Sequence, residues 1–280
     1  MSSLQMRGGT VLAGRYLVLA IGALVSLVPL VYMFLTSLRA NSYMLLTPSQ
    51  VVSGSKSLVN YSQAWSQGGL GRDFVNSMVV AVATVAGVLV LASMMAYAFA
   101  RFDFPGKTFA FAVVVLCQMI PSIMLIIPQF ILAKDMHLLN SRQGLVLFYV
   151  GTNLAFNTFL LRGFFEGIPH ELDEAMIMDG AGAWRRYARL AIPLARPALA
   201  TSAIFAFLAS WDEYVWAVTI LTDDTSRTVP VGIALFAGAH STNWGLTFAA
   251  STIALIPVLV VFLVFQRQFV SGIMSGAVKS

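Results

Sequence analysis

The sequence predicts an all-α, polytopic membrane protein with six transmembrane helices. Of its 280 residues, 58% are hydrophobic and only 10% are charged, whereas soluble domains average about a quarter charged residues. Six apolar stretches are each long enough to cross a hydrocarbon core, which takes about 20 helical residues. Helix is expected because these continuous runs lack the alternating polarity of a barrel strand. The stretches are residues 16–37, 75–100, 108–132, 144–165, 198–221 and 247–269.

The first stretch follows Arg7 and Arg15 and superficially resembles a signal peptide. It is about twice as long as the usual apolar region of such a peptide and lacks a clear cleavage site, so a retained span is predicted. We expect residues 1–71 to form an N-terminal segment with this first span and an external loop. Residues 72–280 then form one membrane core, with a polar loop at 166–197. The polar part of the external loop is either a solvated connection or a contact with an external partner.

Turn and breaker residues separate the later stretches. Asp103-Phe104-Pro105-Gly106 divides the second from the third, and Gly167-Ile168-Pro169 ends the fourth. Three prolines within the stretches are expected to kink their helices, namely Pro121, Pro128 and Pro257.

The lysines and arginines predict the orientation, because cytoplasmic loops carry an excess of them. If the N-terminus is cytoplasmic, eleven of the 17 cations lie inside and six outside. The inner set is Arg7, Arg15, Arg101, Lys107, Arg162, Arg185, Arg186, Arg189, Arg196, Arg267 and Lys279. The outer set is Arg39, Lys56, Arg72, Lys134, Arg142 and Arg227. Both termini and the 166–197 loop are therefore expected in the cytoplasm, and the net charge of +5 indicates topology and not nucleic-acid binding.

Residues 169–191, which we call the elbow, are expected to form two short helices joined by a glycine. Pro169 suits the start of a helix, and three acids in the first turns favour its positive end: Glu171, Asp173 and Glu174. Gly180 can adopt the left-handed conformation that ends the first helix. A second helix near 182–191 presents Arg185, Arg186 and Arg189, and Pro193 and Pro197 then reset the chain into the next span.

The elbow also carries the most specific motif of the chain. Its two parts are Glu174-Ala175-Met176-Ile177-Met178-Asp179-Gly180-Ala181 and Leu190-Ala191-Ile192-Pro193. They resemble the EAA loop of ABC importer permeases, whose pattern is EAAxxDGA followed by IxLP. Met176 and Leu190 depart from that pattern, but both remain apolar.

Other segments resemble the smaller permease subunit of maltose-type carbohydrate importers. They are Asn76-Ser77, Ala96 through Lys107, Ser210-Trp211-Asp212-Glu213-Tyr214, and the tail from Phe265-Gln266 through Gly276-Ala277-Val278-Lys279. Asp212 stands where those relatives usually have Asn.

The resemblance implies a type I ABC importer permease fold, located in a prokaryotic cytoplasmic (inner) membrane. It implies these partners: a second homologous permease forming a heterodimer, two cytoplasmic ATPase subunits, an extracytoplasmic solute-binding protein, a carbohydrate solute and membrane lipid. ATP and magnesium are then expected on the partner ATPase. The implied ATPase-coupling residues are Glu174, Ala175, Asp179, Gly180, Ala181, Leu190, Ile192 and Pro193. The alternative for the elbow is an interfacial helix on lipid headgroups, which its acids disfavour.

Polar and aromatic residues within the predicted spans are candidates for a solute path. Intramembrane acids usually face protein or water, and aromatic faces with polar neighbours suit sugar rings. The candidates are Gln118, Asn153, Asn157, Trp211, Asp212, Glu213, Tyr214 and Trp216. Their alternative role is helix packing and an interfacial aromatic belt.

Three other functions remain open at this point. The first is a permease for glycerol phosphate or a related polar metabolite. The second is an ion-coupled secondary transporter that uses Asp212 or Glu213, and the third is a non-transporting membrane scaffold.

No catalytic, metal or cofactor site is expected in this chain. Gly106-Lys107-Thr108 ends like a phosphate-binding loop, but Arg101 occupies the position of its first glycine. Glu174 stands where a metalloprotease helix beginning at His170 needs its second histidine. The single cysteine, Cys117, excludes an intramolecular disulfide and is expected to pack as a small hydrophobe. We therefore predict a transport protein that is not an enzyme.

Overall fold

The computed structural model describes residues 2–40, 42–238 and 242–277. Val278 and Lys279, which belong to the tail resemblance and to the inner cation set, lie outside the described residues. The chain divides into two compact units, one of residues 1–71 and 233–255 and the other of residues 72–232 and 256–280. The regular secondary structure of the described residues is helical, apart from one isolated β-bridge between Ala237 and Thr242.

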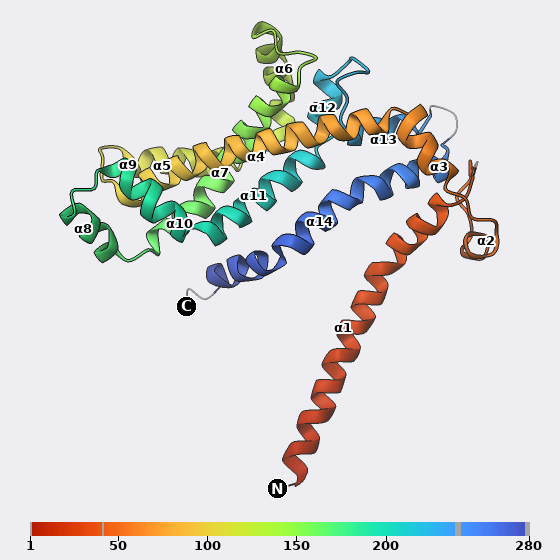
Figure 1. The fold of residues 1–280 in the computed structure, drawn as a ribbon, viewed down its shortest axis with the longest axis horizontal. Coiled ribbons are helices and arrows are strands. Elements are labelled where there is room, and N and C mark those ends of the chain that lie inside the picture. The colour runs from red at the N-terminus through yellow and green to blue at the C-terminus, as the bar shows by residue number, and fades with distance from the viewer. Residues whose placement is uncertain (1, 41, 239–241, 278–280) are drawn as a thin grey trace. The chain divides into compact units, whose positions relative to one another are not determined.

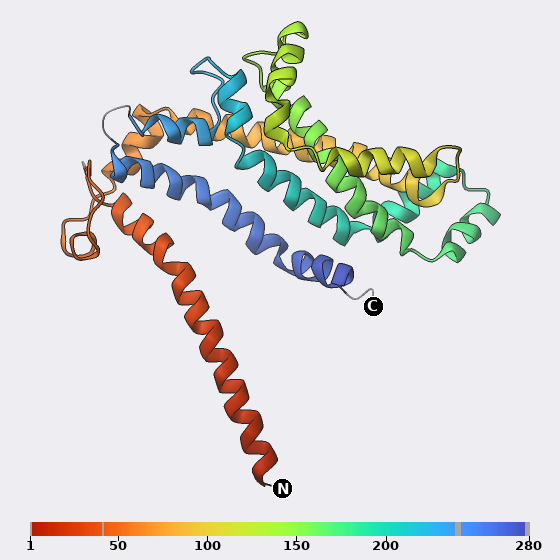
Figure 2. The same cartoon turned by 180° about the vertical axis from the view of Figure 1, so that it is seen from behind.

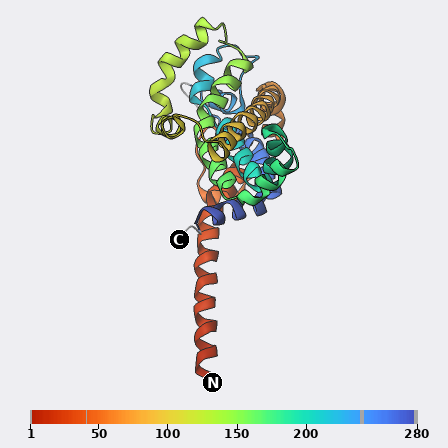
Figure 3. The same cartoon turned by 90° about the vertical axis from the view of Figure 1, so that its left-hand side faces the viewer.

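The first unit begins with one long apolar helix, α1 (Figure 3). The short helices that follow it lie in the polar segment predicted as an external loop. These elements are α1 (Ser2–Ser37), α2 (Pro48–Ser53), α3 (Val59–Ser62) and a π-helix at Gln63–Gln67.

Buried polar residues organise that segment. Arg39 is 7% exposed and donates to the carbonyl oxygens of Gln50, Val51 and Ser55. Asn60 is fully buried, and its amide nitrogen donates to the carbonyl oxygens of Ser37 and Arg39 at 2.7 and 2.8 Å. The segment is therefore a folded cap at the end of α1, held by side-chain bonds to backbone carbonyls.

The second unit contains most of the remaining helices, whose order Figure 1 shows. They are α4 (Leu70–Arg101), α5 (Lys107–Cys117), a 3₁₀ turn at Ser122–Leu125, α6 (Ile126–Asp135), α7 (Arg142–Glu166), α8 (His170–Met178), α9 (Ala183–Arg186), a π-helix at Tyr187–Ala191, α10 (Ile192–Leu194), α11 (Arg196–Trp211) and α12 (Val215–Ile220). The helices α13 (Val229–Leu235) and α14 (Trp244–Ala277) each contribute residues to both units.

Four helices are long and apolar enough to cross a membrane: residues 14–37 of α1, α4, α7, and residues 244–266 of α14. Two bent pairs of helices would raise this number to six. One is α5 with residues 122–135, bent by 93°, and the other is residues 183–194 with α11, bent by 79°.

Two of the six predicted stretches, the third and the fifth, are each divided into more than one helix. The third is interrupted at residues 118–121, because Pro121 restricts the backbone before it and starts a new helical turn. The fifth ends its first helix at Trp211 and resumes at Val215. Cys117 is exposed at the end of α5, so the expectation that it packs inside the protein was wrong.

Small residues pack α4, α7 and α11 against one another, and Figure 1 shows these three helices running together. Buried members of this core are Val88, Ala92, Ala96, Val150, Leu161, Phe165, Ala198 and Ala206. Gly87 of α4 lies against α7, because a Cβ atom there would be 2.7 Å from Cγ2 of Val150. Small side chains let helix backbones come close, which favours packing inside a membrane where the hydrophobic effect contributes little.

Candidate functional site

The first helix of the elbow is α8, which begins directly after Pro169. Pro169 has φ −55° and ψ 135°, so it precedes the helix as its N-cap and does not occupy its first turn. Glu171 and Asp173 lie in the first turn, where negative charge is favourable. Figure 2 shows α8 at the end of α7, seen from behind.

Gly180 ends α8 as the sequence predicts. Its φ is +74°, and its amide nitrogen donates to the carbonyl oxygen of Ile177 at 2.9 Å. The amide nitrogen of Ala181 donates to the carbonyl oxygen of Met176, also at 2.9 Å. This pair of bonds is a Schellman motif, in which a residue with positive φ closes the helix end.

One face of the elbow is exposed although it carries large apolar side chains. Glu174 and Ala175 are exposed on α8, one turn before Met178, which is 87% exposed. Ile177 and Trp184 are 52% and 66% exposed. Ile177 and Met178 lie on α8, which is not among the candidate spans, and exposed apolar side chains outside a span are typical of a surface that another protein covers.

One residue of α8, Asp173, is buried although it is charged, which the sequence did not predict. Asp173 is 6% exposed and forms ion pairs with Arg101, at the end of α4, and with Arg186 of α9. The sequence did hold one indication of this burial. With 3.6 residues per helical turn, Asp173 points in a different direction from Glu174 and Met178. Arg101 had no such signal, since it comes from a distant part of the sequence.

The second half of the elbow is one continuous helical segment with a π-helical turn at Tyr187–Ala191. Pro193, which is exposed, has no N–H to donate and its ring crowds the carbonyl four residues earlier, so the turn before it widens. The chain changes direction at Ala195, before Pro197. Of the predicted coupling residues in this segment, Leu190 and Ile192 are half-buried. Ile192 packs on the core of α4, α7 and α11 and does not belong to the exposed face.

Glu213 lies at the break between α11 and α12 and caps the second helix. Its carboxylate accepts hydrogen bonds from the backbone nitrogens of Trp216 and Ala217 at 2.7 and 3.0 Å. The hydroxyl of Tyr149 on α7 donates to the same carboxylate at 2.6 Å. Asp212 beside it is exposed, and within the described residues no Lys or Arg forms an ion pair with it.

The amides of α7 bond mainly within the protein. Asn157 is fully buried and accepts a hydrogen bond from Ser202 of α11 at 2.6 Å. Asn153, half-buried, donates to the carbonyl oxygen of Tyr149 at 2.8 Å. This geometry gives Asn157 a helix-packing role, while part of Asn153 remains accessible.

The aromatic candidates divide by burial. Trp211 is 2% exposed and its ring meets Phe74 edge-on at 5.4 Å, and Trp216 is 7% exposed and meets Phe148 at 5.0 Å. Tyr214 is 41% exposed. Gln118 is exposed at the bend after α5, on a different element. Gln118, Asp212 and Tyr214 are therefore the candidates most open to a solute.

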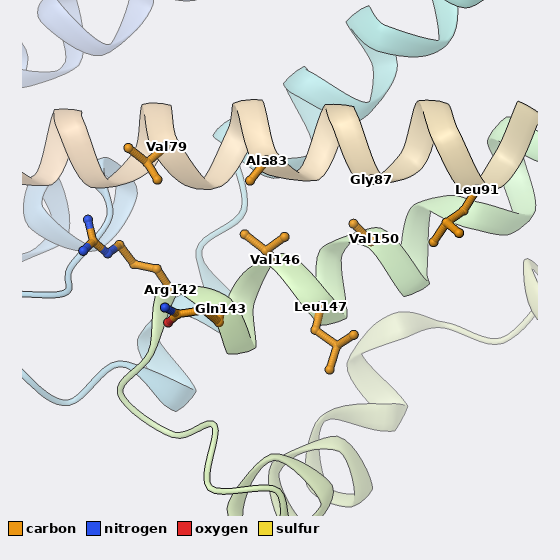
Figure 4. A pocket seen from close by; sticks show the side chains of 9 residues that line it. All are labelled: Val79, Ala83, Gly87, Leu91, Arg142, Gln143, Val146, Leu147 and Val150. Carbon is orange, nitrogen blue, oxygen red and sulfur yellow. The ribbon is translucent and has the colours of Figure 1, made fainter.

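A groove of about 540 Å³ runs between α4 and α7 (Figure 4). It is lined by Val79, Ala83, Gly87, Leu91, Arg142, Gln143, Val146, Leu147 and Val150. Arg142 is the only charged residue among those that line the groove, and it donates to the side-chain oxygen of Asn76 at 3.3 Å. None of the predicted solute-path residues lines this groove, and its apolar walls offer few partners for sugar hydroxyls.

Among the described residues, no group of three or more His, Cys, Asp or Glu side chains is placed to hold a metal ion. Asp173 of the elbow instead pairs with two arginines, and Glu213 at the α11–α12 break accepts hydrogen bonds from backbone N–H groups and a tyrosine hydroxyl.

A bundle of apolar helices that carries an exposed elbow is the architecture of a membrane transport subunit. The chain belongs to the family described as binding-protein-dependent transport system inner membrane component, which it matches over residues 88–275. The predicted resemblance to permeases of carbohydrate ABC importers is confirmed.

Several named proteins are similar in sequence to this chain over most of its length. It is 33% identical to the diacetylchitobiose uptake system permease protein of Streptomyces coelicolor over 93% of this chain and 87% of that protein. It is also 33% identical to the trehalose/maltose transport system permease protein of Thermococcus litoralis, over 92% of this chain and 93% of that one. A chain in the crystal structure of a bacterial ABC transporter that imports the acidic polysaccharide alginate shares the fold, with a TM-score of 0.79, 24% identity, and coverage of 96% and 99%.

Proposed function

We propose that this chain is the permease subunit of an ABC importer that carries a sugar or oligosaccharide across a prokaryotic cytoplasmic membrane. Its partners are a second, homologous permease, two cytoplasmic ATPase subunits and an extracytoplasmic solute-binding protein. ATP and magnesium bind to the ATPases. The carbohydrate class rests on the relatives named for diacetylchitobiose and for trehalose and maltose.

The exposed face of the elbow is the observation that carries this proposal. Glu174, Ala175 and Met178 lie on one side of α8, and Trp184 adds apolar surface from α9. An apolar patch rimmed by charge suits a protein partner better than anionic lipid headgroups, which Glu171 and Glu174 would repel. In this proposal the patch docks on the ATPase, and both termini lie on the same, cytoplasmic side.

Transport then follows from two states of the membrane subunits. ATP binding closes the ATPases and displaces the elbow, and the solute path changes from inward-facing to outward-facing. ATP can drive this change only because it binds the two states with different affinity. Within the path, Gln118, Asp212 and Tyr214 are the side chains that we expect to meet the solute.

Affinity purification of the tagged chain from native membranes tests the proposal. We expect an ATPase and a second permease to co-purify, together with a solute-binding protein that can be screened against carbohydrates. Glu174→Lys reverses a charge on the exposed face and should release the ATPase. Asp103→Lys is the matched control, because Asp103 is an exposed acid in the α4–α5 turn, outside the elbow.

Three results would contradict the proposal. One is an elbow that is dispensable for recovery of the ATPase. Another is uptake that depends on an ion gradient without an ATPase, which would favour the ion-coupled alternative. The last is an ATPase that binds but whose turnover never responds to solute, which would favour a scaffold.

A further inference from the structure

Arg101 is the last residue of α4, and its side chain is buried at the inner face of the elbow. The side chain is only 2% exposed. Its Nη2 atom donates to the carbonyl oxygens of Phe165 and Ile168 at 2.7 and 2.5 Å. These carbonyls lie at and just after the C-terminal end of α7, where the helix dipole favours a cation. Arg101 thus fastens the end of α4 to the end of α7.

The same guanidinium also holds the start of α8. Its Nη1 atom lies 3.3 Å from Oδ2 of Asp173 and donates to Nδ1 of His170 at 3.2 Å. The turn between α7 and α8 consists of residues 167–169, so Arg101 binds both sides of it. The guanidinium group is planar and rigid, and its two terminal nitrogens contact different helices. It therefore fixes the angle at which α8 leaves α7.

Asp173 extends the connection to α9. Its Oδ1 atom lies 3.6 Å from Nη1 of Arg186, and the Asp173 and Arg186 side chains are 9% and 14% exposed. That distance makes an ion pair but not a hydrogen bond. Two arginines, one from α4 and one from α9, therefore share one buried carboxylate.

We propose that Arg101 is a positioning residue that makes the elbow rigid with α4 and α7, so that displacing the elbow moves both helices together. This inference rests on the proposed function, because it assumes that an ATPase displaces the elbow. Arg101 itself is buried and is not part of the exposed face that carries Glu174 and Met178. Without Arg101, α8 can pivot about residues 167–169, and motion of the ATPase no longer reaches the membrane helices.

The inference predicts uncoupling, which a purely structural role would not produce. We would compare wild type, Arg101→Gln and Arg101→Lys in the complete, reconstituted importer. The measurements are the amount of ATPase bound per permease and the ratio of solute transported to ATP hydrolysed. Arg101→Gln should retain the ATPase but lower the ratio several-fold. Arg101→Lys should lower it as well, because one ammonium group cannot reproduce the fork.

Arg162→Gln is the matched control. Arg162 pairs with Glu166 within α7 and stacks over Phe111, without reaching α8, so its loss should leave the ratio unchanged. If Arg101→Gln fails to assemble, Asp173→Asn serves instead. It removes the charge that ties α8 to Arg101 but leaves the bonds from Arg101 to α7.

The outcomes separate this inference from the proposed function. An unchanged ratio in Arg101→Gln and Asp173→Asn, in a complex whose wild type couples, would overturn the inference alone. A fall in assembled complex at a constant ratio would assign Arg101 a structural role only and would also overturn it. A wild-type chain that binds no ATPase would instead overturn the proposed function.

Discussion

Gly180 and Gly182 lie two residues apart in the elbow but have different backbone conformations. Gly180 has φ +74°, whereas Gly182 has φ −67° and ψ 169°, which any residue can adopt. A Cβ atom at either position would meet nothing within 4 Å. Any difference between their alanine variants therefore comes from the backbone and not from packing.

We predict that Gly180→Ala destabilises the elbow by about 1–2 kcal/mol, the cost of a left-handed L-residue. Gly182→Ala should be neutral, or stabilising by up to about 1 kcal/mol, because it restricts the unfolded chain. Thermal unfolding of the purified subunit measures both, and ATPase co-purification should fall only for Gly180→Ala. Equal effects of the two variants on stability would show that the Schellman motif at Gly180 does not stabilise the elbow.

Glu213 and Asp212 are adjacent acids with different surroundings, and the structure separates their roles. Glu213 accepts three hydrogen bonds, whereas Asp212 is exposed. We predict that Glu213→Gln lowers the free energy of unfolding by about 1–3 kcal/mol, because an amide cannot accept all three bonds. Asp212→Asn should leave stability unchanged but alter solute uptake.

Melting curves and uptake assays on these two variants test that assignment. A destabilised Asp212→Asn protein beside a stable Glu213→Gln protein would reverse the two roles.

At the scale of elements, α4 and α7 pack through a contact that glycine makes possible. A Cβ atom on Gly87 would lie 2.7 Å from Cγ2 of Val150. We predict that Gly87→Ala costs about 1–3 kcal/mol through overpacking. Val150→Ala removes the clashing methyl groups, so the double variant should be more stable than the sum of the single changes predicts.

A double-mutant cycle on detergent-solubilised protein measures this coupling. Strictly additive effects would mean that the two helices can shift apart at no cost, contrary to the close packing of Gly87 on Val150.

The sequence predicted where the long helices lie better than where they break. Continuous apolar composition identified α4, α7 and α14, because a membrane span needs only length and hydrophobicity. The same composition continues through residues 118–121 and 212–214, where the helices stop. Pro121 gave a local signal for the first break. The second depends on Glu213 capping α12 and bonding to Tyr149 of another helix, which composition alone cannot reveal.

At the scale of the whole molecule, the elbow was predictable as a motif but not as a mechanical joint. The motif is local, so the sequence placed Glu174 and Gly180 correctly on a helix and at its end. The buried contacts of Asp173 come from α4 and α9, and only folding brings Arg101 to them. Short-range patterns therefore locate the proposed docking face, whereas the contacts between the elbow and α4 can be found only in the structure.

Site-specific crosslinking from Met178 tests the central claim most directly. A photo-reactive amino acid would replace Met178, which is 87% exposed on the elbow, and a second variant would carry it at Asp103 in the α4–α5 turn. In intact cells we predict an adduct between the Met178 position and a cytoplasmic ATPase, and far less of it from Asp103. Adducts to lipid alone, or equal yields from both positions, would contradict the account.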